Sequence, residues 1–248
     1  MKIDIFDTTL RDGFQQEGIS PSVKDKLAIA KLLDDLGVDY IEGGWPGASP
    51  KEEEFFDKAK KELKLKNAKL VSFGSTRKLN IKVEEDPQVK ALVDAGTEYV
   101  CIVGKSSNLH ITKAIETDVE EAIKMATDTI EYLKSNGKKV FFDAEHFFDG
   151  YKENSEVSYK ILDAVINEGV DCFIFCDTNA CKSGVNCTSF PLLVFTFVVP
   201  EPPCCICCSC CATGTLSSFR SASVISFDNF TIATSNILYI SFIVFSPC

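Results

Sequence analysis

The sequence predicts an α/β fold, an incomplete (β/α)8 TIM barrel of about six strands, followed by a tail that does not belong to the barrel. Short apolar runs alternate with segments of helical periodicity through residues 1–180. Polar or charged residues follow the ends of most of these runs, and charged residues almost vanish beyond residue 180. Strands that alternate with helices favour a parallel sheet with right-handed crossovers.

Six apolar runs of strand length are the predicted strands. They lie at residues 2–6, 39–43, 69–73, 98–103, 139–144 and 171–177. Between them, residues 23–36, 119–133 and 157–165 repeat apolar side chains with the period of an amphipathic helix. Ser or Asp precedes the first two helices as an N-cap, and Gly follows all three as a stop: Ser22, Asp118, Gly37, Gly137 and Gly169.

A doubly wound sheet and most of a (β/α)8 barrel both fit this order of elements. A nucleotide-binding doubly wound sheet needs a glycine-rich turn after its first strand, and DTTLRDG at 7–13 is not one. Barrel enzymes place their chemistry at the carboxyl ends of the strands. Charged and hydroxyl residues stand at these ends here: Asp7, Arg11, Asp12, Glu42, Ser72, Ser75, Asp143, Glu145, Asp177 and Thr178. The barrel is therefore favoured.

Arg11 and Asp12, beyond the first strand, suggest a charged site. Asp12 would bind a divalent cation, because hard cations take carboxylate oxygens. Arg11 would stabilise a developing oxyanion, because its guanidinium stays charged and donates in a fixed fork. A surface salt bridge of Arg11 with Asp7 or Asp12 explains the same spacing equally well.

The charge balance excludes some partners. The 248 residues carry a formal net charge of -10 with a pI near 4.8, which argues against a nucleic-acid-binding surface. The first residues do not resemble a signal peptide, and no apolar run reaches the roughly 18 residues of a membrane span. A cytoplasmic protein without nucleic-acid or membrane partners is expected.

The run D-T-T-L-R-D-G-F-Q at 7–15 resembles the opening signature of the pyruvate-carboxyltransferase-like, metal-dependent barrel family. That family includes 2-isopropylmalate, homocitrate and citramalate synthases and hydroxymethylglutaryl-CoA lyase. Further matches are IEGGWPGASPKE at 41–52, FFDAEHFFDGYK at 141–152 and CDTNA at 176–180. The residues of the second and third motifs, IEGGWPG and AEHFFDGYK, resemble the citramalate synthase branch more than the isopropylmalate branch. The resemblance covers residues 1–180.

The resemblance implies a condensation of acetyl-CoA with pyruvate that yields citramalate, a step of isoleucine biosynthesis. It implies that Asp12 binds a divalent metal (Mg, Mn or Zn) and that Arg11 acts with this metal on the keto group of the substrate. Gln15 would support the metal shell and the bound substrate. A homodimer is implied as well. A sister activity, 2-isopropylmalate or homocitrate synthesis or the lyase reaction, is the enzymatic alternative.

Three more residues match positions that lie near the substrate in the family. Glu145 would orient the substrate or transfer a proton. Thr178 would hydrogen-bond the substrate carboxylate. Asp143 would shape the 2-oxoacid pocket, and a role as a cap or loop hydrogen-bond acceptor is equally compatible with its position.

The second half of the family's metal site has no counterpart in the sequence. The family supplies two imidazole ligands from an H-x-H-N-D motif after its seventh strand, whereas this chain has two histidines in total, His110 and His146. A structural or supporting role is expected for His146, and His110 is expected to be solvated. One carboxylate without an imidazole pair should bind a divalent ion weakly.

Residues 181–248 form a tail rich in Cys, Ser and Phe. It holds nine of the twelve cysteines but only four charged residues. Its apolar runs at 190–199 and 237–245 are strand-like. The tail does not resemble the seventh and eighth strands of the family, and a barrel left unclosed would expose two strand edges. Six cysteines at 204–211 are spaced too closely for a structural zinc site, and a metallothionein-like cluster is the alternative.

Three hypotheses about function follow. The first is a citramalate-synthase-like barrel whose tail comes from a frameshift or a mis-joined gene model and is poorly ordered, so that this chain has little or no activity. The second is a sister enzyme of the same family. The third is a non-catalytic fragment or a thiol-rich metal-binding module. The frameshift hypothesis is tested by sequencing the DNA across codon 181.

Overall fold

The structure is a computed structural model that describes residues 4–176, 178, 196–200 and 240–244. All six predicted strands are present and pair in parallel in chain order. They are β1 (Ile5–Asp7), β2 (Tyr40–Gly44), β3 (Lys69–Ser75), β4 (Tyr99–Lys105), β5 (Lys139–Glu145) and β6 (Cys172–Phe175). The parallel part of the predicted barrel is therefore confirmed.

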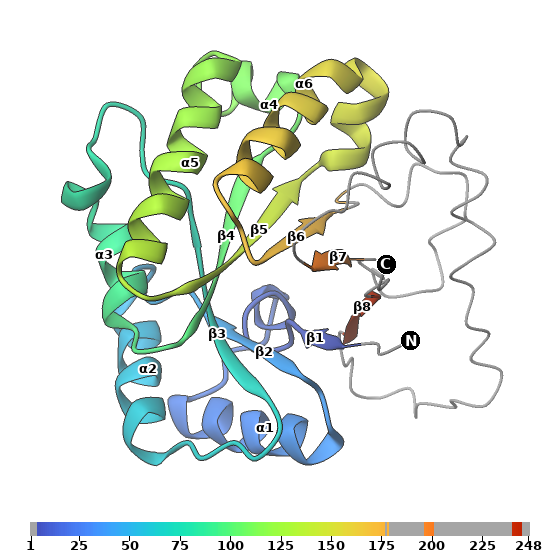
Figure 1. The fold of residues 1–248 in the computed structure, drawn as a ribbon. Coiled ribbons are helices and arrows are strands. Elements are labelled where there is room, and N and C mark those ends of the chain that lie inside the picture. Colours follow the sequence, from blue (N-terminus) through green and yellow to red (C-terminus); the bar gives the residue numbers. More distant parts are fainter. Residues whose placement is uncertain (1–3, 177, 179–195, 201–239, 245–248) are drawn as a thin grey trace, which may run out of the picture.

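Helices pack on the outside of these strands (Figure 1). They are α1 (Val23–Leu36), α2 (Pro50–Glu62), α3 (Pro87–Asp94), α4 (Asn108–Lys113), α5 (Val119–Ser135) and α6 (Phe147–Asn167), with single 3-10 turns at Gly13–Gln15 (η1) and Val83–Glu85 (η2). In the part of the chain that the structure describes, no helix is both long enough and apolar enough to cross a membrane.

The predicted helix ends are confirmed where a side chain or a left-handed glycine caps the helix. Ser22 Oγ accepts from the main-chain N–H of Asp25 at 3.2 Å, and the Asp25 carboxylate accepts from the N–H of Ser22 at 2.9 Å. Gly37 ends α1 at φ 92°, a conformation that glycine adopts without strain. Asp118 caps α5 by accepting from the N–H of Glu121 at 2.8 Å.

The last predicted helix, at 157–165, covers only the second half of the observed helix. α6 begins at Phe147, and its first turns are joined to residues 155–167 across a kink at Asn154, whose φ and ψ are -154° and 92°. Asn154 interrupts the periodic pattern, which is why the sequence indicates only the second half. Phe147 is 7% exposed and anchors the first half in the helix-facing core.

Two short strands close the barrel of β-strands. β7 (Thr196–Pro200) and β8 (Ile240–Val244) overlap the two apolar runs of the tail, and they pair with each other in parallel. β7 is antiparallel to β6 and β8 is antiparallel to β1, so neither continues the parallel series. The expectation of two unpaired edges is therefore wrong, because an open strand edge can pair with an extended segment of either direction. The cysteine run 204–211 lies outside the described residues.

The alternation of strand side chains separates the interior of the barrel from the layer under the helices. In β5, Val140, Phe142 and Ala144 join the core beneath the helices, whereas Phe141 faces the barrel interior. Aromatic rings fill that interior, with the Tyr40 ring in edge contact with the rings of Tyr99 and Phe141 at 5.3 and 5.2 Å. The same alternation places Asp143 and Glu145 on the inner side, at the carboxyl end of β5.

Candidate active site

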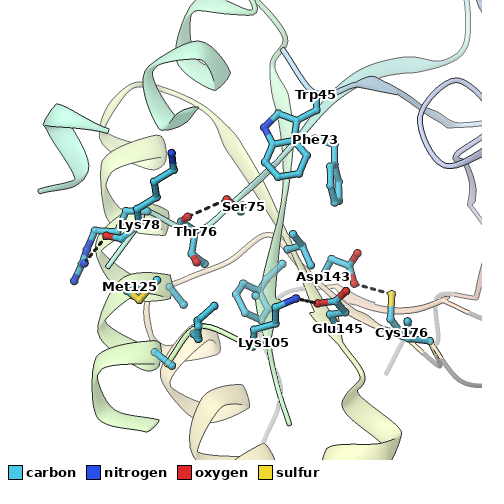
Figure 2. Close-up of a pocket in the computed structure, with 18 of the residues that line it drawn as sticks. Trp45, Phe73, Ser75, Thr76, Lys78, Lys105, Met125, Asp143, Glu145 and Cys176 are labelled. Atoms are coloured by element: carbon cyan, nitrogen blue, oxygen red, sulfur yellow. Dashed lines mark hydrogen bonds and ion pairs between the residues drawn. The ribbon is translucent and has the colours of Figure 1, made fainter. Parts of the chain in front are cut away.

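A cavity of about 610 Å³ lies at the carboxyl ends of the strands (Figure 2). Its walls come from the segments after β1 and β2, from the ends of β3, β4 and β5, from residues 76–79, from α5 and from the residues after β6. The six residues that the sequence nominated all line it: Arg11, Asp12, Gln15, Asp143, Glu145 and Thr178. Residues from distant parts of the sequence thus meet at one site, as the barrel topology predicts. Asp177, a further strand-end residue, lies outside the described residues.

The turn after β1 is held by its own main chain. The carbonyl of Thr8 accepts from the N–H groups of Arg11, Asp12 and Gly13 at 3.1, 2.9 and 3.2 Å. The buried carboxylate of Asp7 accepts from the N–H and the hydroxyl of Thr9, both at 3.0 Å. Burial raises the pKa of Asp7 to about 6 despite these hydrogen bonds. The turn thereby directs Arg11 and Asp12 toward the cavity.

Arg11 is a largely buried cation with three contacts. Its Nε donates to Glu42 Oε1 at 2.5 Å, its guanidinium also donates to Asp12 Oδ1 at 3.3 Å, and its guanidinium carbon lies 4.0 Å from the centre of the Phe73 ring. Its side chain is 16% exposed. The alternative of a salt bridge with Asp12 is thus present as a contact, but Arg11 is largely buried and its shorter contact is with the buried Glu42.

Glu42, which the sequence places at the end of the second strand without assigning it a role, is a residue of the site. Its side chain is 1% exposed, and burial raises its pKa although the charge of Arg11 opposes the shift. Burial alone would lower the pKa of Arg11, but the charges of Glu42 and Asp12 outweigh it and raise the pKa. Arg11 therefore stays cationic. The feature of the sequence that points to a role for Glu42 in the site is its position at the end of the second strand.

Asp143 and Cys176 form a hydrogen-bonded pair in the wall of the cavity. The thiol of Cys176 donates to Asp143 Oδ1 at 2.6 Å. Burial raises the pKa of Asp143 to about 7, while the Cys176 hydrogen bond and the charge of Arg11 lower it. Burial and the neighbouring Asp143 raise the pKa of Cys176, so that its thiol keeps its proton. Cys176 is a residue of the site that sequence reasoning missed.

Glu145 is the last residue of β5, and Thr178 follows the neighbouring strand β6. The ammonium of Lys105, at the end of β4, donates to Glu145 Oε2 (Figure 2). Thr178 Oγ1 accepts from the N–H of His146 at 3.0 Å. Because the oxygen of Thr178 is held as an acceptor, its own hydroxyl proton can be directed toward a ligand.

The rings of the two histidines of the chain are in contact, tilted by 39° to each other. Their ring centres are 3.9 Å apart, and His110 lies on α4 while His146 precedes α6 in the left-handed conformation at φ 57°. His110 Nδ1 is buried, and burial together with His146 lowers the pKa of His110. The expectation of a solvated His110 is wrong, because the packing of α4 against α6 brings the two rings together.

The described residues do not by themselves make up a divalent-metal site. Asp12 is 35% exposed beside the cavity, and Gln15 follows it in η1. Within the described ranges, no three side chains of His, Cys, Asp and Glu come together as a metal-binding cluster. The rings of His110 and His146 contact each other. The two residues are far from Asp12 in the sequence and do not form an H-x-H motif. Asp12 is thus a single carboxylate ligand candidate.

Comparison with known proteins places most of the chain in one family of sequences. A sequence profile described as HMGL-like matches residues 2–189. An (R)-citramalate synthase from Aquifex aeolicus is 56% identical over 178 residues, or 72% of this chain and 34% of the relative. A second, from Streptomyces coelicolor, is 50% identical over 71% of this chain and 33% of the relative. A probable 2-isopropylmalate synthase from Archaeoglobus fulgidus is 36% identical over 68% of this chain and 31% of the relative.

The chain spans about a third of the length of these curated relatives. Among solved structures, an HMG-CoA lyase from Bacillus subtilis superimposes with a TM-score of 0.57 at 18% identity, covering 70% of this chain and 57% of that one. The HMG-CoA lyase from Brucella melitensis gives a TM-score of 0.54 at 14% identity over 70% of this chain and 61% of that one. These likenesses establish the fold. Together with the sequence profile over residues 2–189, they show that the chain belongs to the HMGL-like family.

Proposed function

We propose that this protein is an acyltransferase of the (R)-citramalate synthase type, which condenses acetyl-CoA with pyruvate. The observation that supports it is the convergence of Arg11, Asp12, Asp143, Glu145 and Thr178 on one cavity. Relatives named (R)-citramalate synthase, which share 46–56% identity over 175–178 aligned residues, support the same reaction. A cytoplasmic location belongs to the proposal, because both substrates are cytoplasmic metabolites.

In this reaction the methyl group of acetyl-CoA loses a proton, and its carbon bonds to the keto carbon of pyruvate. The keto oxygen then gains negative charge and takes up a proton, and hydrolysis of the thioester releases CoA. Arg11 would hold the developing charge on that oxygen, since it is a buried cation whose orientation Glu42 fixes. The hydroxyl of Thr178 would donate to the pyruvate carboxylate. Glu145 would move or hold the proton.

A divalent cation, Mg, Mn or Zn, is implied by the family and would polarise the substrate's keto group. Asp12 is the ligand that we propose from the described residues, with Gln15 beside it. We also propose that residues 1–180 form the family's catalytic domain and that 181–248 are a tail of different sequence character, although its strands β7 and β8 pair with β6 and β1. Because the H-x-H pair is missing from the sequence, turnover by this chain is expected to be slow or absent.

The proposed partners are pyruvate and acetyl-CoA, together with a second copy of the chain. Leu32 and Leu36 support a homodimer, because they lie one turn apart on α1 and are 66% and 61% exposed. Light scattering of the purified chain measures its mass in solution. A monomer at all concentrations would contradict the dimer. Substituting both leucines with glutamate should shift a dimer toward the monomer.

The test measures pyruvate binding by calorimetry and CoA release from acetyl-CoA in parallel. Arg11→Met should abolish pyruvate binding and lower any CoA release by about 10²-fold, the usual cost of losing an oxyanion donor. Lys124→Met, on the exposed side of α5, is the matched control and should change neither. Preference for a larger 2-oxoacid over pyruvate would favour the sister activities. Binding of no 2-oxoacid at all would overturn the proposal in favour of a non-catalytic protein.

A further inference from the structure

Lys105 and Glu145 face each other across the neighbouring strands β4 and β5. They are partners in the parallel register, and the ammonium of Lys105 donates to Glu145 Oε2. Both side chains point to the inner side of the barrel and line the cavity, as Figure 2 shows. The residue before Lys105 is Gly104, whose missing side chain leaves room for the Phe142 ring under the helices. The pair therefore follows from the strand alternation and is part of the cavity wall.

The backbone that carries Lys105 is fixed to the backbone that carries Glu145. The N–H and the hydroxyl of Ser106 both donate to the main-chain carbonyl of Glu145, at 3.3 and 2.6 Å. The carbonyl of Ser106 in turn accepts from Ser158 Oγ of α6 at 3.2 Å. Gly150 permits this close approach, because a Cβ there would lie 2.5 Å from the Ser106 carbonyl oxygen. Lys105 is thus mounted on a buried, hydrogen-bonded segment.

The charges around Glu145 explain why a neighbouring cation is required to keep its carboxylate at the cavity wall. Asp143 lies two residues before it on the same face of β5, and the charge of Glu145 raises the pKa of Asp143. Two neighbouring carboxylates repel each other, so an unpaired Glu145 would turn toward solvent. The side chains of Lys105 and Glu145 are 30% and 28% exposed, and pairs that exposed contribute little to stability. The effect of Lys105 is therefore on the position of Glu145.

We propose that Lys105 is a positioning residue, which holds the carboxylate of Glu145 against the cavity wall in the orientation used for the reaction. The inference rests on the proposed function in assigning Glu145 to the chemistry. The placement of Glu145 by Lys105 stands on the contacts alone. Lys105 acts through Glu145 and does not itself contact the reacting atoms.

The first arm of the test is structural and does not depend on turnover. Crystal structures of Lys105→Met, Lys105→Arg and the control Lys124→Met are compared with that of the unchanged protein. In Lys105→Met the Glu145 carboxylate should leave its place on the cavity wall, while the hydrogen bonds between Ser106 and Glu145 persist. It should stay in place in Lys105→Arg and Lys124→Met. A Glu145 side chain that keeps its place in Lys105→Met overturns the proposal.

The second arm measures kcat and the KM for pyruvate. Lys105→Met should lower kcat about 10²-fold, as misplacing a reacting group does, with a much smaller change in KM. Lys105→Arg should recover most of the rate. In Glu145→Gln, adding Lys105→Met should have no further effect on kcat, and an equal further loss would overturn the proposal. If the unchanged protein releases no CoA and binds no pyruvate, the proposed function fails, and the structural arm still decides the role of Lys105.

Discussion

Arg11 Nε lies 2.5 Å from Glu42 Oε1, and this contact joins the ends of β1 and β2 inside the barrel. The carboxylate is 1% exposed and the guanidinium side chain 16% exposed, so water screens the pair weakly. Phe73 covers the guanidinium from the neighbouring strand β3. The cation that would meet a substrate's oxygen is therefore held by a partner that a substrate does not reach.

Neutralising Glu42 should destabilise the protein because it leaves Arg11 as a buried cation without its main partner. Glu42→Gln should lower the free energy of unfolding by about 3 kcal/mol, the cost of breaking a buried pair from one side. Urea unfolding measures the change. The double variant Arg11→Met with Glu42→Gln should recover part of the loss, because no uncompensated charge is left. A double variant less stable than Glu42→Gln would contradict this account.

Asp143 should make stability fall as the pH rises toward neutrality. Its pKa is raised to about 7 in the folded protein from 3.8, so the folded state binds more protons between these values than the unfolded state does. Asp143→Asn removes this proton uptake, and its advantage in stability over the unchanged protein should grow from pH 5 to pH 8. Urea unfolding at each pH measures it. Asp163→Asn, at an exposed position on α6, is the control. If the gain in stability from Asp143→Asn did not change with pH, the raised pKa of Asp143 would be refuted.

The hydrogen bond from Cys176 to Asp143 should contribute measurably to stability. Cys176→Ala removes the donor and should cost about 1.5–3 kcal/mol above pH 7, where the carboxylate is charged. Cys176→Ser keeps a donor and should cost less. At pH 5, where Asp143 is protonated, the difference between the two variants should shrink. Thermal unfolding of both variants at the two pH values distinguishes this from a simple packing defect, which would not depend on pH.

The titration of the paired histidines should be visible directly by NMR, because the chain has only two histidines. Burial and the neighbouring His146 lower the pKa of His110 from 6.5, so one imidazole should titrate below the ordinary range. Since the unfolded state then binds the proton more readily, stability should fall as the pH drops below about 6.5. His146→Asn should move the His110 titration back toward 6.5. No movement would mean that burial alone sets it.

Much of the candidate site was predictable from the sequence because it depends on local rules. Alternation along a strand and the parallel order of strands place the residues that end each strand on one rim, so Asp143 and Glu145 could be assigned to the site without a structure. The caps at Ser22, Asp118 and Gly37 follow from hydrogen bonds within a few residues. These features need no knowledge of distant contacts.

The sequence by itself determined the parallel α/β series, the ends of α1 and α5, and the set of polar residues at the rim. Only the tertiary structure decided that Arg11 pairs with Glu42, that Lys105 holds Glu145, and that β7 and β8 enter antiparallel. The partners in these ion pairs are 31 and 40 positions apart in the chain. The register between strands and the exclusion of water set such contacts, and no local pattern of residues encodes either one.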